Sequence, residues 1–209
     1  AVKYTKGALL SIANDYAREA GMRNYEKALD KIHRKLARKV VTGEAQPQFK
    51  IDTENLQEYL GKPVFVEDTV KKVNQPGMTI GLAWTPFGGD VLVVEAVSNP
   101  GKGGFRITGQ MGEVMQESAG IAYTYARSKT EELGIDADWW DNRHIHLHIP
   151  AGAIRKDGPS AGITMATALI SLATGRKIKP RIGMTGELSL IGQVLPIGGL
   201  KEKTIAARR

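Results

Sequence analysis

The chain has 209 residues, 42% hydrophobic and 24% charged, which is enough apolar content for an ordinary globular core and excludes a wholly disordered chain. No apolar run approaches the roughly 18 residues of a membrane-spanning helix, and the first residues do not form a signal peptide. The absence of cysteine excludes thiol nucleophiles, disulfides and thiolate metal sites.

The net charge of +7 is concentrated near the N-terminus, where residues 1–46 hold ten Lys or Arg against five Asp or Glu. One interpretation is an arm that binds nucleic acid. The other is the solvated face of a helix with basic residues toward its C-terminal end. Because the basic residues are interleaved with a regular apolar stripe, we favour the helix face, and nucleic-acid binding stays an alternative without a supporting motif.

Residues 8–41 are predicted to form two helices. Apolar residues recur at steps of three and four: Leu9, Ile12, Ala13 and Tyr16 in the first helix, and Met22, Tyr25, Leu29, Ile32 and Leu36 in the second. Gly21 between them can adopt the left-handed conformation that ends a helix. Two such helices cannot close a core alone, so this segment either docks on the rest of the chain or is the end of another domain, and residues 43–47 are the predicted boundary.

Beyond this boundary the pattern changes to strands and later to alternating helices and strands. Strands are predicted over 78–85, 91–97, 105–108, 144–149, 181–187 and 193–197, and helices over 112–133, 160–174 and from residue 200. The sequence Gly88-Gly89-Asp90 predicts a hairpin between the first two strands. Hairpins early and helix–strand alternation late together predict an α+β fold.

The segment from Lys156 to Gly162 contains Gly-x-Ser-x-Gly around Ser160, the pattern of the α/β-hydrolase nucleophile. That fold is rejected because no apolar strand leads into the pattern and all four histidines precede Ser160. Ser160 could simply begin a helix, where serine is favoured. The two roles are compatible, because free N–H groups at a helix start can stabilise an oxyanion.

Without a later histidine, a lysine is the obvious base for Ser160. The lysines that follow are Lys177, Lys179, Lys201 and Lys203. The first two stand in a polar loop, where a lysine stays protonated near its reference pKa of about 10.4. Lys203 shares a helical face with Leu200, Thr204 and Ala207, whereas Lys201 lies about 200° away. The spacing favours Lys203 as a buried base, with an ordinary surface lysine as the alternative.

Lys156–Gly162, followed by Gly198–Lys203, resembles the A-type Lon proteases. Segments 81–85, 108–118, 144–150, 184–189 and 192–197 match the same family in the same order. The resemblance covers the chain from about residue 60 onward. Residues 1–45 resemble the tail of the family's AAA+ ATPase module, in which Arg23 matches the second nucleotide-sensing arginine.

The resemblance implies a mixed-sheet proteolytic domain preceded by a short helical segment. We expect a helical remnant of the ATPase module at 1–45, a linker at 46–62 and a Ser-Lys peptidase domain at 63–209. The family carries a further strand–helix segment after the last helix, so we also expect this domain to be truncated at its C-terminus.

The implied function is that of an ATP-dependent serine endopeptidase. Ser160 would be the nucleophile and Lys203 its base, with Thr185 orienting the lysine through its hydroxyl. Asp157 matches the acidic residue of a loop that shifts between open and closed forms, or it serves as a turn or cap carboxylate. Trp84 matches a residue lining the substrate groove, with core packing as the alternative.

The resemblance further implies unfolded polypeptides as substrates, a homo-hexamer in the full-length enzyme, and a bacterial cytoplasm or a mitochondrial matrix as location. No phosphate-binding loop is present, so we expect no cofactor in this chain, and ATP and Mg only in the full-length enzyme. His144, His146 and His148 share a strand face that could hold zinc, but no carboxylate ligand is evident and we expect no metal. A catalytically silent interaction module is the alternative from another class.

Overall fold

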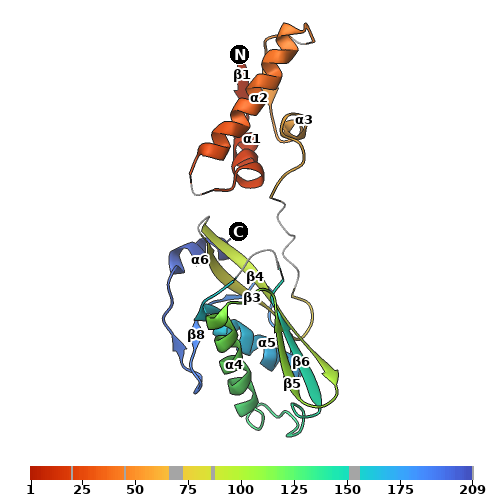
Figure 1. The fold of residues 1–209 in the computed structure, drawn as a ribbon, viewed down its shortest axis with the longest axis vertical. Coiled ribbons are helices and arrows are strands. Elements are labelled where there is room, and N and C mark those ends of the chain that lie inside the picture. The colour runs from red at the N-terminus through yellow and green to blue at the C-terminus, as the bar shows by residue number, and fades with distance from the viewer. Residues whose placement is uncertain (20, 45, 66–72, 86–87, 151–155, 209) are drawn as a thin grey trace. The chain divides into compact units, whose positions relative to one another are not determined.

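The computed structural model describes residues 1–19, 21–44, 46–65, 73–85, 88–150 and 156–208. The chain forms two compact units, Ala1–Val70 and Lys71–Arg209 (Figure 1). In the described parts of both units, no helix is long and apolar enough to cross a membrane.

The first unit is a small helical unit with two short strands. Its elements are β1 (Val2–Tyr4), α1 (Lys6–Ser11), a π-helical turn (Ile12–Tyr16), α2 (Arg23–Val41), β2 (Phe49–Ile51) and α3 (Leu56–Leu60). Strands β1 and β2 pair in parallel, and Thr5 caps α1 by accepting a hydrogen bond from the Ala8 amide. Its core contains Ile12, Ile32, Leu36, Ile51 and Leu56, each almost fully buried.

The basic side chains of α2 contribute to this packing. Lys31 donates to the carbonyl of Leu60 at 3.2 Å, Lys35 donates to the carbonyl of Glu58 at 3.1 Å, and Lys39 pairs with the Glu58 carboxylate. Three lysines of the basic segment thus hold α3 against α2. These contacts support the helix-face interpretation of the N-terminal charge.

The two predicted helices of residues 8–41 are present, but the break between them differs from the prediction. The first helical stretch ends at Tyr16, well before Gly21, and Gly21 does not adopt a positive φ. The start of α2 is instead held by Glu19, whose carboxylate accepts the amides of Asn24 and Tyr25 at 2.5 and 3.1 Å. The predicted linker 46–62 contains β2 and α3, and the predicted boundaries at residues 45 and 62 stay predictions.

The second unit is built on a mixed five-stranded sheet in the order β5-β6-β4-β3-β7. The strands are β3 (Met78–Thr85), β4 (Gly88–Pro100), β5 (Gly104–Thr108), β6 (Arg143–His148) and β7 (Gly183–Met184). The pairs β3–β4 and β4–β6 are antiparallel, whereas β5–β6 and β3–β7 are parallel. The α+β fold with a mixed sheet is therefore confirmed.

Three helices and a small hairpin complete the unit. They are α4 (Glu113–Ser128), α5 (Gly162–Thr174), α6 (Leu200–Ala207), and the hairpin of β8 (Glu187–Leu188) and β9 (Val194–Leu195). Helix α5 packs on β3 and β4, and α4 packs on α5. The Thr79 hydroxyl of β3 donates to the Thr164 carbonyl of α5 at 3.1 Å, so sheet and helix are joined in the core.

Local details differ from the predicted elements. Gly88-Gly89-Asp90 is not the hairpin turn, because these residues already pair with Thr85, Trp84 and Ala83 as the first part of β4. The predicted strand 181–187 is divided between β7 and β8, which belong to different sheets. Helix α4 ends at Ser128, and its buried face begins at Met115 while Val114 is exposed.

Candidate active site

Ser160 lies in a 3-10 turn, Pro159–Ala161, that leads directly into α5. Its carbonyl accepts the amide of Gly186 at 2.8 Å and the hydroxyl of Thr185 at 3.2 Å. Gly158 precedes the turn with a φ of 116°, a backbone conformation that residues other than glycine rarely adopt. The main chain of Ser160 is thus fixed by the segment between β7 and β8, and the serine stands at the start of a helix as its sequence predicts.

Lys203 on α6 approaches the same segment. Its Nζ donates to the Thr185 hydroxyl at 3.1 Å, and only 3% of the residue is exposed. Burial lowers the pKa of Lys203 because the ammonium form loses its hydration. Within the described part of the chain Lys203 forms no ion pair, so no carboxylate offsets that loss. A lysine in this environment becomes neutral more easily than one in water.

The Thr185 hydroxyl joins Lys203 to the main chain of Ser160, because it accepts from the lysine and donates to the serine carbonyl. The structure therefore brings together three residues that the sequence placed in the site. Lys201, the competing lysine, is exposed. The expected burial of Leu200 and Ala207 is wrong, since both are exposed and Ala206 shares the buried face with Lys203.

The end of the β3–β4 hairpin sets the position of α6. A Cβ atom at Gly89 would overlap the carbonyl of Glu202 and crowd Ala206, so only glycine allows the strand to approach the helix this closely. At Gly199, where φ is 68°, a Cβ would lie 3.0 Å from Cβ of Trp84. Trp84 is 57% exposed, so it is not a core residue; its indole lies beside the start of α6.

The chain before Ser160 is fixed to a second segment, at the start of α4. The Asp157 carboxylate accepts the amides of Met115 and Gly158 at 3.0 and 2.9 Å. The Ser118 hydroxyl donates to the Pro159 carbonyl at 3.3 Å. Asp157 is thus a cap carboxylate, as one interpretation of the sequence predicted, but it caps α4 rather than the helix that follows it.

Lys156 is a residue of this site to which the sequence assigned no role. It is 7% exposed, its Nζ donates to the Gly109 carbonyl at 3.0 Å, and burial lowers its pKa. Its place in the Lys156–Gly162 motif was visible in the sequence. Its burial was not, because a lysine next to an aspartate in a glycine-rich loop usually faces solvent.

Two of the three alternating histidines of β6, His146 and His148, share one hydrogen-bonding partner. The Thr108 hydroxyl is hydrogen-bonded to His146 Nε2 at 2.8 Å and to His148 Nδ1 at 2.7 Å, while His144 is exposed. Burial and the nearby Arg106 lower the pKa of His146. Among the residues with described positions, no group of three or more His, Cys, Asp or Glu could hold a metal ion.

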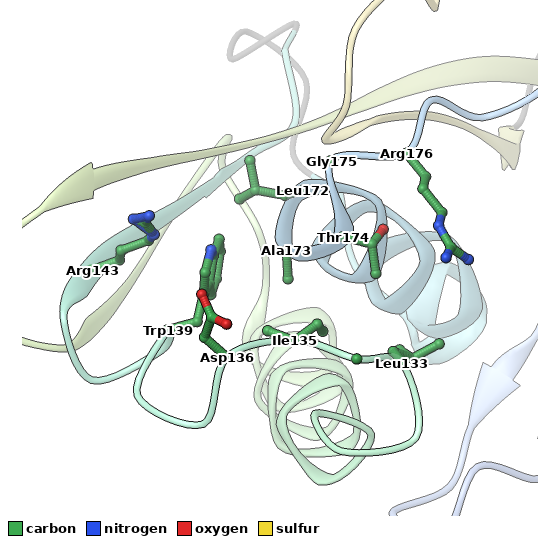
Figure 2. A pocket seen from close by; sticks show the side chains of 11 residues that line it. Leu133, Ile135, Asp136, Trp139, Arg143, Leu172, Ala173, Thr174, Gly175 and Arg176 are labelled. Carbon is green, nitrogen blue, oxygen red and sulfur yellow. The ribbon is translucent and has the colours of Figure 1, made fainter.

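A cavity of about 460 Å³ lies at the far end of α5 from Ser160 (Figure 2). It is lined by Leu133–Asp136, Trp139, Arg143 and Leu172–Arg176. A helix of 13 residues spans about 20 Å, so this cavity is separate from the Ser160 site.

Arg23, the predicted nucleotide sensor, lies in the other unit, exposed at the first position of α2.

Comparison with known proteins identifies the family. Residues 50–209 match the C-terminal proteolytic domain of Lon protease (S16), and residues 1–49 match the Lon protease AAA+ ATPase lid domain. Lon protease of Treponema pallidum is 56% identical over 211 residues, covering all of this chain and 24% of that protein. Lon protease of Chloroflexus aurantiacus is 52% identical, with 98% of this chain and 25% of that protein covered. Lon protease of Mycolicibacterium smegmatis is 50% identical, with 100% and 27% covered.

The chain thus spans about a quarter of the length of these relatives. The two family matches meet at residues 49 and 50 and together cover every residue. On the strength of these matches and of identities of 50% or more, the chain belongs to the Lon protease family.

Proposed function

We propose that this chain is the peptidase part of an ATP-dependent Lon protease, a serine endopeptidase that cleaves unfolded or damaged proteins through a Ser160–Lys203 dyad. The observation that carries the proposal is the hydroxyl of Thr185, which binds Lys203 Nζ on one side and the Ser160 carbonyl on the other. A shared neighbour of this kind holds a nucleophile and its base in one arrangement.

In the proposed reaction, neutral Lys203 takes the hydroxyl proton of Ser160 while Oγ attacks the carbonyl carbon of the scissile peptide. The lysine then gives this proton to the leaving amine as the C–N bond breaks, which leaves an acyl ester on Ser160. A water molecule then loses a proton to Lys203 and attacks the ester carbonyl, and the lysine returns this proton to Ser160 Oγ as the ester C–O bond breaks and the acid is released. Free N–H groups at the start of α5 are suited to stabilise the oxyanion of both tetrahedral intermediates.

The burial of Lys203 supports its assignment as the base. A protonated lysine cannot accept a proton, so the pKa must fall toward the working pH before the reaction can begin. Loss of hydration moves the pKa of Lys203 in this direction. Thr185 would orient the amine, because a neutral lysine that donates one hydrogen bond can aim its lone pair elsewhere.

Trp84 and Asp157 are proposed to act around the dyad rather than in it. Trp84 presents an exposed indole at the end of β3 beside α6, which suits a wall of the substrate groove. Asp157 holds the loop before Ser160 to α4, so its contacts with Met115 and Gly158 would define one of the loop's two forms.

The remaining assignments are carried over from the family resemblance of the sequence. We propose a helical remnant of the ATPase module over 1–45, a linker over 46–62 and the peptidase domain over 63–209. The assembled enzyme would be a homo-hexamer driven by ATP and Mg, in a bacterial cytoplasm or a mitochondrial matrix. An exposed Arg23 without a phosphate-binding loop does not fit a nucleotide site in this chain alone, so no step above involves ATP.

The test is modification of the protein by a peptide boronate, followed by mass spectrometry of the labelled segment. We expect one adduct, on Ser160, and no cleavage of an unstructured protein by Ser160→Ala. Ser128→Ala, which changes an exposed serine at the end of α4, is the matched control and should keep full activity. Turnover by Ser160→Ala above an empty preparation, or an adduct on another residue, would overturn the assignment.

A further inference from the structure

The chain reaches Ser160 only after crossing the segment that joins β5 to α4. Lys156 makes the main contacts of this crossing. Its amide donates to the Gln110 carbonyl at 3.0 Å, and its own carbonyl accepts the amide of Gly112 at 2.7 Å. Its Nζ reaches back to the Gly109 carbonyl at 3.0 Å. The main chain and the side chain of Lys156 thus both fix the loop before Ser160, residues 156–159, to the Gly109–Gly112 segment.

The segment that Lys156 binds has an unusual backbone. Gly109 has φ 120° and Gln110 has φ 57°, and the second of these is uncommon for a residue with a side chain. Such conformations persist only where neighbouring contacts hold them. The amine of Lys156 satisfies a carbonyl in this turn, and its main chain continues the sheet-like pairing with a bridge to Met111.

Ser160 therefore lies between two fixed points. On one side, Thr185 and Gly186 bind its carbonyl, and Thr185 also holds Lys203. On the other side, four residues earlier, Lys156 binds the Gly109–Gly112 segment. The base, Lys203, is held only at the first of these two points, through Thr185. A shift at the second point would thus move the serine relative to the lysine, and a misplacement of about 1 Å can lower a rate about a hundredfold.

An apolar side chain at position 156 could fill the space that the Lys156 side chain occupies, but it could not donate a hydrogen bond to the Gly109 carbonyl. The residue is buried, so a lost hydrogen bond there would not be replaced easily by water. The amine of Lys156 thus adds a buried contact to those that Asp157 and Ser118 make between this loop and the start of α4.

We infer that Lys156 is a positioning residue, which docks the loop before Ser160 onto the Gly109–Gly112 segment and thereby aligns the nucleophile with Lys203. This inference rests on the proposed function, because it concerns the geometry of the proposed dyad. Lys156 itself does not touch the reacting atoms.

The experiment measures the rate at which a peptidyl sulfonyl fluoride inactivates the full-length protein. It compares the Lys156→Met variant with Lys177→Met, an exposed control. Rates are expressed per folded molecule. We expect the limiting rate of inactivation to fall about tenfold or more in Lys156→Met, with the half-saturating concentration within about twofold, because the dyad is misaligned while the groove is kept. Lys177→Met should match the unmodified protein.

Hydrogen exchange gives a readout that does not depend on activity. In Lys156→Met, the amides of residues 109–118 should exchange about tenfold faster, while those of α5 should not change, because the loop no longer protects Gly112 and Met115. A limiting rate within twofold of the unmodified protein, or unchanged exchange at 109–118, would overturn the inference. If the unmodified protein is not labelled at Ser160, the proposed function fails and the inference fails with it; if it is labelled, only the inference is at risk.

Discussion

Gly112 leaves open the space that the carboxylate of Asp157 occupies. A Cβ atom at position 112 would overlap that carboxylate, which accepts the amide of Met115 at 3.0 Å. Gly112 is the N-cap residue of α4 and has no side chain with which to cap it. The aspartate of the Ser160 loop performs that task, so the start of α4 and the approach to the nucleophile depend on each other.

Gly112→Ala should therefore weaken both the N-terminal end of α4 and the position of the loop that carries Ser160. The new methyl group displaces the Asp157 carboxylate, which removes a cap worth about 1 kcal/mol and moves the loop that carries Ser160. Urea unfolding and the rate of adduct formation at Ser160 measure the two effects. The control is Gly120→Ala in the same helix, where a Cβ meets nothing within 4 Å and the free energy of unfolding should rise by about 0.5–1 kcal/mol. Equal behaviour of the two variants would contradict the role given to Gly112.

Lys203→Gln should abolish peptide cleavage, whereas Lys201→Gln should keep most of it. Lys203 is buried against Thr185, while Lys201 on the same helix is exposed. Burial lowers the pKa of Lys203, so the neutral, active form grows as the pH rises through that lowered value. Activity should rise with pH along a limb that lies below the ordinary lysine value of about 10.4. A pH–rate profile checks this, and an active Lys203→Gln with an inactive Lys201→Gln would show that the wrong lysine has been chosen.

Thr185→Val should lower kcat about tenfold to a hundredfold and leave the fold intact. Valine has nearly the shape of threonine but lacks the hydroxyl that binds both Lys203 and the Ser160 carbonyl. Thr185→Ser keeps a hydroxyl and should recover most of the rate. Steady-state kinetics on one peptide substrate compares the three proteins. If valine and serine variants are equally active, the hydroxyl does not orient the lysine.

The sequence predicts the fold wherever side-chain periodicity reports burial. The strand over 78–85 and the helix over 160–174 follow from their apolar patterns and appear as β3 and α5. On α6 the same reasoning predicted the burial of Lys203 but chose the wrong companions, because the helix packs against the Gly89 strand through Ala206 rather than through Leu200. Periodicity gives a face only when a helix is amphipathic, and this short helix has no clear apolar side.

The candidate site needed more than periodicity. Motif and spacing indicate Ser160 and Lys203, family resemblance adds Thr185, and the catalytic roles of all three stay predictions. The contacts of Lys156 with Gly109 and of Asp157 with Met115 were out of reach, because each joins residues more than 40 positions apart. No local rule relates such residues, and only the folded chain shows that Gly112 leaves room for Asp157.

Gly89→Ala should remove activity from a distance by displacing the helix that carries the base. A Cβ at this position would overlap the Glu202 carbonyl and crowd Ala206, and a backbone atom cannot move aside as a side-chain end can. Helix α6 has eight residues and depends on such packing for its stability, so we expect it to shift or fray. The matched control is Gly198→Ala, just before the helix, where a Cβ meets nothing within 4 Å. Labelling of Ser160 should be lost or slowed at least tenfold in Gly89→Ala and retained in Gly198→Ala, since a small displacement of Lys203 from Thr185 is enough to disable the dyad. Normal labelling in Gly89→Ala would mean that α6 tolerates the displacement, and that the close approach of strand and helix does not set the position of the lysine.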